Sequence, residues 1–506
     1  MARHARTGTG TESSPRRPGT LRRDALSVLG AIAMAMAFMG PATSAAFNTQ
    51  PAAAGVGYAL PFAILLALVA CLLVANTIAA FARKLPTAGF VYTFNTQGFG
   101  RDGGFMSGWL LLLGYGMVGP MLFAAIGEFS SAFILTQWHV HIAWEFISLT
   151  FVLIVWGINA LGISRSAKTA LVFLVLEVGV MVGLFSTILA KGGAQGLSFS
   201  PFNPLHSLKG VSGLGTGMLW GILMFIGFES AGTLGEEAKA PRRTIPIALF
   251  TGVGVIGVFY VLSGWAAAIG FGHGHVGAFV ADGNPFLTLA SRYWGFTWLL
   301  ALTVLNSQFA NLISGCNAFV RVLFSMGREG IMPRLLGTTD RSHVPQAALA
   351  GYMLFSLAYA LGVGSQIGPL GVYAFAGTIL GLAMVICYIL MSAAVIRFYR
   401  RDYPAEFSVL KHGVFPVIAA VLMLLPIYGL VWPVPAYPSN LVPWITLAWL
   451  AAGAVYLWTI HNRRPELLDA MGRVFTDRTD EEEADRPAPA PSSTQAPGDA
   501  SPQASG

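Results

Sequence analysis

Long apolar runs, separated by short polar segments, dominate the sequence from residue 25 to residue 461. Most of them reach the roughly 20 residues that an α-helix needs to cross the hydrocarbon core of a bilayer. The pattern predicts an all-α polytopic membrane protein with about twelve transmembrane helices. The predicted spans cover residues 25–47, 57–81, 104–135, 142–163, 166–190, 211–235, 245–271, 286–325, 345–363, 371–396, 414–433 and 441–461. The third and the eighth are long enough to be tilted or to extend beyond the bilayer.

The Lys and Arg residues between these runs follow a strict alternation. They gather in the N-terminal tail, in every second connection and in the C-terminal tail, and only Lys191, Lys209 and Arg292 lie elsewhere. Short loops that are rich in positive charge remain in the cytoplasm. The alternation therefore predicts a multi-pass protein of the cytoplasmic membrane with both termini in the cytoplasm.

The composition supports this interpretation and excludes several others. Hydrophobic residues make up 55% of the chain and charged residues 10%, whereas an average soluble chain carries roughly 25% charged residues. The net charge of +7 does not indicate a nucleic-acid partner, because the basic residues are spread over loops rather than gathered on one face. We expect a lipid bilayer as the surroundings of the chain and no nucleic acid as a partner.

The sequence offers no set of residues for catalysis. Its three cysteines, Cys71, Cys316 and Cys387, lie in separate apolar runs, so no Cys-x-x-Cys metal site is formed. No Gly-Lys-Ser/Thr phosphate loop is present, which argues against an ATP-driven pump. We therefore expect neither an enzyme nor a metal site nor an organic cofactor.

Two runs are interrupted near their middle by residues that break helices. In Met39–Ser44, Pro41 lacks the N–H of a helix residue and its ring would clash with the carbonyl of Ala37. In Phe225–Ser230, Glu229 lies among glycines at mid-membrane depth. The two breaks lie five helices apart, so the chain can be divided into two five-helix repeats. Because five is odd, the second repeat begins on the opposite side of the membrane from the first, which is typical of inverted repeats. We predict a disordered basic cytoplasmic tail over 1–24, one repeat over 25–191, a second over 211–397, two further helices over 413–461 and a mostly disordered cytoplasmic tail over 462–506.

Few carboxylates lie within the predicted spans. Glu128, Glu177 and Glu229 are deep, and Glu145 lies near the outer end of the fourth span. An isolated ionised carboxylate at the bilayer centre costs of order 3 kcal/mol, so such residues usually face a water-filled cavity or carry a proton. The alternative for each is a protonated carboxyl that only joins neighbouring helices.

Three motifs resemble those of the amino acid–polyamine–organocation (APC) superfamily of permeases. Leu219–Ile247, which reads LWGILMFIGFESAGTLGEEAKAPRRTIPI, is similar to the sixth-helix signature of that family. Ala82–Gly89, followed by Tyr92, is similar to the family's first cytoplasmic turn. Asn317–Arg321 and Met326–Pro333 resemble the end of its eighth helix. The resemblance covers about residues 25–460 and is closest to bacterial amino acid permeases.

The resemblance implies a leucine-transporter-like fold and secondary transport of an amino acid or a related amine. The free N–H groups after the first break suit a carboxylate, and the free carbonyls of the second suit an ammonium. We expect an aromatic residue such as Phe225 to close over the substrate. The expected substrate-binding residues are Met39, Gly40, Pro41, Ala42, Thr43, Ser44, Phe225, Ile226, Gly227, Phe228, Glu229 and Ser230.

The resemblance also suggests where transport is coupled to an ion. A charged residue on the fifth helix that faces the first often supports coupling in the family, and Glu177 is nearest that position. Because no histidine or aspartate is embedded in the predicted spans, we expect protons rather than Na⁺ as the coupling ion, through Glu177 or Glu229. We expect Glu229, which lies at the break itself, to hold the unwound segment in shape.

Several alternatives remain open at this point. The first break reads Met-Gly-Pro-Ala, where family members often show Gly-Ser-Gly, so the substrate class is undetermined. An amino-acid-binding membrane sensor, or a transporter of another small organic solute, would share these features. The sequence does not decide which of four polar residues point inward, nor the oligomeric state, the direction of transport, or symport against antiport. The four residues are Tyr115, Asn306, Asn311 and Tyr373.

Overall fold

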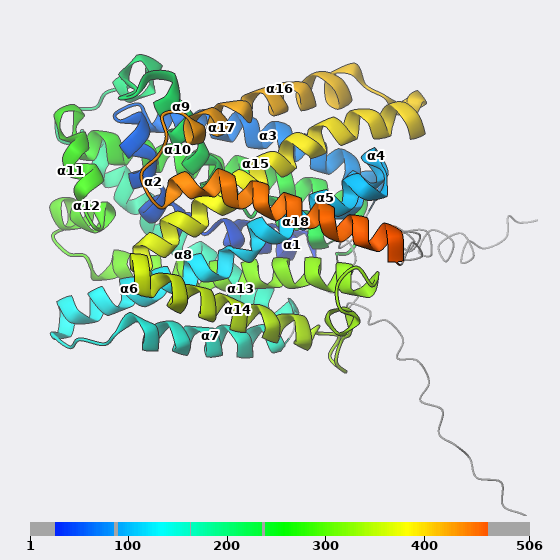
Figure 1. The fold of residues 1–506 in the computed structure, drawn as a ribbon. Helices are drawn as coiled ribbons and strands as arrows, with labels where there is room; N and C mark the ends of the chain where they lie inside the picture. The colour runs from blue at the N-terminus through cyan, green and yellow to red at the C-terminus, as the bar shows by residue number, and fades with distance from the viewer. Residues whose placement is uncertain (1–25, 86–89, 162, 235–237, 464–506) are drawn as a thin grey trace, which may run out of the picture.

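The computed structural model describes residues 26–85, 90–161, 163–234 and 238–463. Both predicted tails lie almost entirely outside these residues. The described chain is helical throughout and contains no strand, and its helices run roughly parallel to one direction (Figure 1). The α-helices are α1 Val28–Met39, α2 Pro41–Val56, α3 Leu60–Lys84, α4 Val91–Phe99, α5 Arg101–Gly116, α6 Val118–Trp138, α7 Trp144–Ala160, α8 Ile163–Ala190, α9 Gly210–Phe225, α10 Pro241–Phe271, α11 Val276–Ala281, α12 Pro285–Trp294, α13 Trp298–Arg328, α14 Gln346–Ile367, α15 Pro369–Asp402, α16 Phe415–Leu422, α17 Leu424–Val431 and α18 Val442–Arg463.

Eight shorter elements connect or extend these helices. Seven are 3₁₀-helices, and one is a π-helix directly before α16. They are η1 Ser200–Phe202, η2 Pro204–His206, η3 Phe228–Leu234, η4 His273–His275, η5 Arg334–Gly337, η6 Pro404–Glu406, η7 Val409–Val414 and η8 Ser439–Leu441. The 3₁₀-helix η3 continues the apolar segment that begins with α9, and together they form the candidate membrane span Gly210–Leu234.

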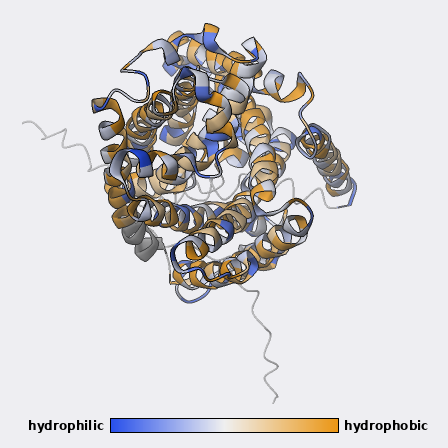
Figure 2. Cartoon of the chain, turned by 90° about the vertical axis from the view of Figure 1, so that its left-hand side faces the viewer, coloured by the Kyte–Doolittle hydropathy of each residue, from blue (hydrophilic) through white to orange (hydrophobic). Residues whose placement is uncertain are grey.

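The predicted spans agree closely with the helices. Eleven helical segments of the described chain are long and apolar enough to cross a membrane, and α7, at 17 residues, is a shorter apolar helix. Hydrophobic residues cover most of the helix surfaces (Figure 2). The prediction of an all-α polytopic membrane protein with about twelve spanning helices is confirmed.

Two long predicted spans are organised differently from the expectation. The predicted third span is the nearly continuous pair α5 and α6, which together form the most deeply buried part of the bundle. The predicted eighth span is wrong as one helix, because α12 ends at Trp294 and a new helix, α13, begins at Trp298. Gly295 ends α12 in a left-handed conformation (φ 80°), with its N–H donating to the carbonyl of Ser291.

The first break divides the first span into α1 and α2. Gly40 adopts a left-handed conformation (φ 54°), which glycine reaches without strain, and Pro41 begins α2 at the position where a missing N–H costs nothing. The N–H of Gly40 still donates to the carbonyl of Ala37 at 3.1 Å. The chain therefore changes direction at one residue and remains helical on either side.

The second break divides the sixth span into α9 and the 3₁₀-helix η3. At Gly227 φ is 123°, a value that residues with a Cβ rarely adopt. A Cβ added at Gly227 would lie 2.8 Å from the backbone nitrogen of Met39 and 2.8 Å from the carbonyl carbon of Phe38. The two breaks therefore touch, backbone against backbone, and this contact requires a glycine.

The broken segments lie in the interior of the bundle. Helix α1 packs against α10, α8, α13 and η3, and α2 packs against α9 and α13. The helices α16, α17 and α18 lie at the periphery (Figure 1). On α18, large apolar side chains such as Trp444 and Trp458 are about two-thirds exposed, as lipid-facing residues would be. The fold thus places two backbone breaks inside a lipid-facing shell.

Candidate functional site

A small cavity lies between the two breaks. Its volume is about 20 Å³, which is room for about one water molecule. Residues from α1, α2, α6, α9, α13 and α15 line it. They are Phe38, Met39, Ser44, Asn48, Val118, Met121, Leu223, Ile226, Asn311, Tyr373 and Leu380.

Three of the expected substrate-binding residues line this cavity: Met39, Ser44 and Ile226. The other nine lie around it without forming its wall. Phe225, expected to close over the substrate, is fully buried and packs edge-on against Tyr260, with the ring centroids 5.2 Å apart. The aromatic residues that line the cavity are Phe38 and Tyr373, and Phe225 is not among its described lining residues.

The carbonyl of Met39 is freed from its helix at the first break and accepts two hydrogen bonds. The Tyr260 hydroxyl donates to it at 2.8 Å, and the Ser44 hydroxyl donates at 2.7 Å. A buried carbonyl without a partner would cost about 1–3 kcal/mol. These two hydroxyls therefore stabilise the break and connect α1 to α2 and α10.

The first N–H groups of α2 also have partners from other helices. The N–H of Thr43 donates to the Ser307 hydroxyl of α13 at 3.0 Å. The Glu177 carboxyl of α8 lies beside the N–H of Ala42 and beside Ser307. Glu177 is completely buried, and neither of its oxygens forms a hydrogen bond of regular geometry. A carboxyl group in this position faces the positive end of the α2 dipole.

Glu229 is held by the second break itself. One carboxyl oxygen accepts a hydrogen bond from the N–H of Gly227 at 3.0 Å, and the other accepts one from the Tyr115 hydroxyl at 2.8 Å. Glu229 is fully buried and does not line the cavity. Its contacts fix the conformation of the unwound segment and attach that segment to α5.

The structure shows which of the four polar residues left open by the sequence have side chains that line the cavity. Asn311 and Tyr373 line the cavity, whereas Tyr115 contacts Glu229 and Asn306 donates to the carbonyl of Phe173 at 2.9 Å. The Tyr373 hydroxyl donates to the side-chain oxygen of Asn48 at 2.8 Å. The side-chain oxygen of Asn311 is buried and has no hydrogen-bond partner in the described part of the chain.

Asn311 also covers the first break. A Cβ added at Gly40 would lie 2.3 Å from the amide nitrogen of Asn311, so this side chain packs directly on the glycine. Together, Asn311, Asn48, Ser44 and Tyr373 supply the polar groups of the cavity. Every other lining side chain that the structure describes is apolar, and none of these residues is charged.

Sequence reasoning left Asn311 and Tyr373 as open candidates and missed six other lining residues. Asn48 could have been found, since it lies one helical turn after Ser44 on the same face of α2. The inward faces of α6, α13 and α15 depend on helix rotation, which an apolar sequence does not encode clearly. The missed residues are Phe38, Asn48, Val118, Met121, Leu223 and Leu380.

Discontinuous helices around a buried cavity in a lipid-facing bundle define a class of membrane transporter. A sequence model of the family described as "Amino acid permease" matches residues 30–466, and the chain belongs to this family. The resemblance to the APC superfamily is confirmed, and the protein is a multi-pass membrane protein of the permease type.

Curated relatives resemble the chain over most of its length. A methylthioribose transporter of Bacillus subtilis is 23% identical over 450 residues, which cover 83% of this chain and 89% of the relative. A branched-chain amino acid permease of Lactococcus lactis is 24% identical and covers 82% and 90%. A lysine-specific permease of Lactococcus lactis is 27% identical and covers 71% and 72%.

A solved structure confirms the fold. The crystal structure of a mutant manganese transporter of Eremococcus coleocola matches with a TM-score of 0.52, covering 89% of this chain and 99% of that one. The sequence identity is 12%, so the match concerns the arrangement of the helices alone. The chain therefore has a leucine-transporter-like fold.

Proposed function

We propose that this protein is a secondary transporter that moves a neutral amino acid across the cytoplasmic membrane by alternating access. One observation carries the proposal: the two helix breaks touch at Gly227 and Met39 and border a cavity with polar groups on an otherwise apolar wall. A cavity of about 20 Å³ is too small for an amino acid. The structure therefore corresponds to a closed conformation, and the substrate enters when the helices around the cavity separate.

The wall of the cavity favours a substrate with an apolar side chain. Seven of the eleven described lining residues are apolar, and none of the lining residues that the structure describes carries a charge. The apolar ones are Phe38, Met39, Val118, Met121, Leu223, Ile226 and Leu380. Burying a cationic side chain without a partner is expensive. The proposed substrate class is a neutral amino acid with an apolar side chain rather than lysine or a polyamine, and the similarity to branched-chain amino acid permeases supports it.

The polar groups of the cavity suit the charged backbone of an amino acid. The unpartnered oxygen of Asn311 is an acceptor for the α-ammonium group, because a buried acceptor gains most from a charged donor. The N-terminal end of α2 offers a positive dipole end for the α-carboxylate, with the Ser44 hydroxyl at its cavity-facing side. Asn311 and Ser44 are thus the residues of α13 and α2 that fix the orientation of the substrate.

Glu177 is the proposed site of proton coupling. Its carboxyl lies at the N-terminal end of α2, next to Ala42, and Glu177 is not among the described lining residues of the cavity. An ionised carboxylate there is stabilised by the helix dipole, whereas a protonated one leaves the positive end of α2 to the substrate carboxylate. Proton binding at Glu177 and substrate binding in the cavity therefore favour each other through α2. A Na⁺-coupled mechanism is the alternative.

A second candidate function is transport of another small organic solute. The similarity to a methylthioribose transporter favours it, because that relative is matched over 89% of its length. The polar groups of the cavity would then bind hydroxyls instead of a charged backbone.

A thermal-shift screen of the purified protein tests the proposed substrate class. Leucine, isoleucine, valine and methionine are expected to raise the unfolding temperature, since a ligand that binds only the folded state stabilises it. Lysine, putrescine and methylthioribose are expected to have no effect at the same concentration. Stabilisation by methylthioribose alone would support the second candidate, and stabilisation by lysine or putrescine would contradict the argument from the uncharged wall. A sensor without transport would bind the neutral amino acids but show no uptake in proteoliposomes.

A further inference from the structure

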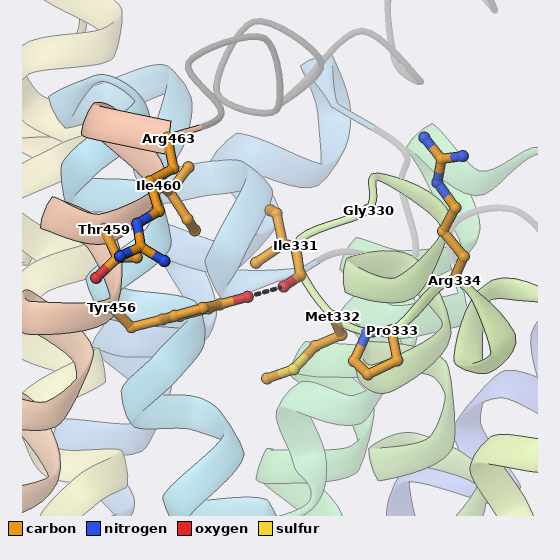
Figure 3. Close-up of a pocket in the computed structure, with 9 residues that line it drawn as sticks. All are labelled: Gly330, Ile331, Met332, Pro333, Arg334, Tyr456, Thr459, Ile460 and Arg463. Atoms are coloured by element: carbon orange, nitrogen blue, oxygen red, sulfur yellow. Dashed lines mark hydrogen bonds between the residues drawn. The ribbon is translucent and has the colours of Figure 1, made fainter.

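A second and larger pocket lies far from the central cavity, at the end of the bundle where α18 ends. Its volume is about 670 Å³. One wall is the last two turns of α18, and the other is the connection between α13 and η5 (Figure 3). The lining residues are Gly330, Ile331, Met332, Pro333, Arg334, Tyr456, Thr459, Ile460 and Arg463.

The two walls are joined by a hydrogen bond. The Tyr456 hydroxyl of α18 donates to the carbonyl of Ile331 at 2.7 Å (Figure 3). Tyr456, Thr459, Ile460 and Arg463 follow each other at the spacing of one helix face. The pocket is therefore built by a defined face of α18 and a fixed segment of backbone.

The described lining residues give the pocket a positive charge. Arg334 and Arg463 lie on opposite sides (Figure 3), both are exposed, and none of the lining residues that the structure describes is acidic. Among the residues that the structure describes, neither arginine forms an ion pair or a hydrogen bond. The Arg463 side chain lies along α18, whereas the Arg334 side chain extends away from it, beyond Gly330 (Figure 3). Exposed guanidinium groups at a pocket suit an anion with several oxygens, such as a phosphate group.

The position of the pocket adds an apolar requirement. Helix α18 is a peripheral helix whose Trp458 is 67% exposed, and aromatic residues of this kind gather at the level of the lipid headgroups. Ile331 and Ile460 are buried and form an apolar part of the lining next to the arginines. A ligand that carries a phosphate beside an apolar body matches both parts.

We propose that this pocket binds the phosphate headgroup of an anionic phospholipid of the cytoplasmic leaflet. Arg463 binds the phosphate from the α18 side, and Arg334 reaches it from the η5 side by a change of its side-chain rotamer. Ile331, Met332 and Ile460 contact the glycerol and upper acyl region. The bound lipid joins α18 to the end of α13. It does so at a site separate from the cavity that binds the transported solute.

Lipid retention measured by native mass spectrometry tests the proposal on the full chain. The purified protein is incubated with phosphatidylglycerol or phosphatidylcholine in detergent. The wild-type chain is expected to retain one phosphatidylglycerol and to show no preference for phosphatidylcholine. Each of Arg334→Gln and Arg463→Gln is expected to weaken phosphatidylglycerol binding by about tenfold, the size expected for one charge-assisted hydrogen bond.

Two further variants separate a site from general surface charge. Arg341→Gln removes a charge from the same connection outside the pocket and is expected to retain the lipid as the wild type does. Thr459→Trp fills the pocket without changing the charge and is expected to lose the lipid. An equal loss in Arg341→Gln, or full retention in Thr459→Trp with an unchanged unfolding temperature, would overturn the proposal.

A third experiment distinguishes a soluble phosphate from a lipid headgroup as the ligand of the pocket. Inorganic phosphate at millimolar concentration is added to lipid-free protein, and the unfolding temperature is measured. No shift is expected, because a phosphate without an apolar body uses only part of the pocket. A different result would overturn the lipid proposal and assign the pocket to a soluble phosphate. In that case inorganic phosphate raises the unfolding temperature of the wild type but not of the double variant Arg334→Gln/Arg463→Gln, and the wild type retains no phosphatidylglycerol.

Discussion

At the scale of single residues, the sequence located the breaks but not the full wall of the cavity. Gly40, Pro41 and Gly227 could be found because glycine and proline act on the backbone locally. Asn311 and Tyr373 remained two among four open candidates, since their direction depends on how α13 and α15 rotate in the bundle. The structure resolves that choice by packing Asn311 on Gly40 and Tyr373 on Asn48.

A residue-scale prediction concerns Asn311. Asn311→Ala removes the unpartnered acceptor of the cavity and is expected to raise the KM for uptake about tenfold or more, because a hydrogen bond to a charged group contributes about 1.5–3 kcal/mol. Asn306→Ala is the matched control, since Asn306 lies on the same helix but bonds the carbonyl of Phe173. Uptake kinetics of both variants in proteoliposomes measure the effect. Equal KM values would remove Asn311 from the substrate site.

The two buried glutamates lead to different expectations. Glu177→Gln is expected to abolish the pH dependence of net uptake while substrate exchange continues, because the variant keeps the shape of the side chain but carries no titratable group. Uptake and counterflow across a range of pH values measure the two activities. Unchanged pH dependence in this variant would overturn the assignment of Glu177.

Glu229→Gln is expected to weaken substrate binding itself. An amide offers one acceptor oxygen, whereas Glu229 accepts from both the N–H of Gly227 and the Tyr115 hydroxyl. One of these donors loses its partner, which costs about 1–3 kcal/mol and loosens the unwound segment. A binding titration by thermal shift checks this, and wild-type affinity would show that Glu229 does not shape the site.

At the scale of elements, the central feature is the contact between the two helix breaks, at the end of α1 and at Gly227. The apolar periodicity predicted the spans, and the division of the eighth into α12 and α13 was missed because Gly295 lies within an otherwise apolar stretch. The contact between Gly227 and the end of α1 could not be predicted, since it joins residues that are nearly 190 positions apart. Such a contact depends on tertiary packing and requires the structure.

Gly227→Ala tests this contact between elements. The added Cβ would approach the backbone of Phe38 and Met39 to 2.8 Å, and the positive φ adds strain of order 1–3 kcal/mol. We expect the unfolding temperature to fall by several degrees and uptake to be lost. Gly254→Ala in α10 is the control, because its Cβ would meet no atom within 4 Å. Wild-type uptake by Gly227→Ala would show that the breaks need not touch.

At the scale of the whole molecule, the alternation of basic connections agrees with the arrangement of the helices. The ends of α13 and α18 lie at one end of the bundle, and α11 and α12 lie at the other (Figure 1). The connections that follow α13 and α18 are rich in arginine, whereas α11 and α12 contain a single Lys or Arg residue, Arg292. This asymmetry predicts the orientation in the membrane, with the arginine-rich connections in the cytoplasm.

Reporter fusions check the orientation. A reporter fused after Arg464 is expected to be cytoplasmic, and one inserted in Gly272–Asp282 is expected to be outside. Fluorescent and alkaline phosphatase reporters give opposite signals in the two compartments. An external C-terminal reporter would contradict a chain with twelve spans and cytoplasmic termini.

Uptake driven by an imposed pH gradient tests the central claim most directly. The wild-type protein in proteoliposomes with an alkaline interior, in Na⁺-free buffer, is expected to accumulate labelled leucine or another neutral amino acid above the external concentration. The accumulation is expected to collapse when a protonophore is added. A strict requirement for Na⁺, or no uptake of any neutral amino acid by protein that is folded and inserted, would contradict the account.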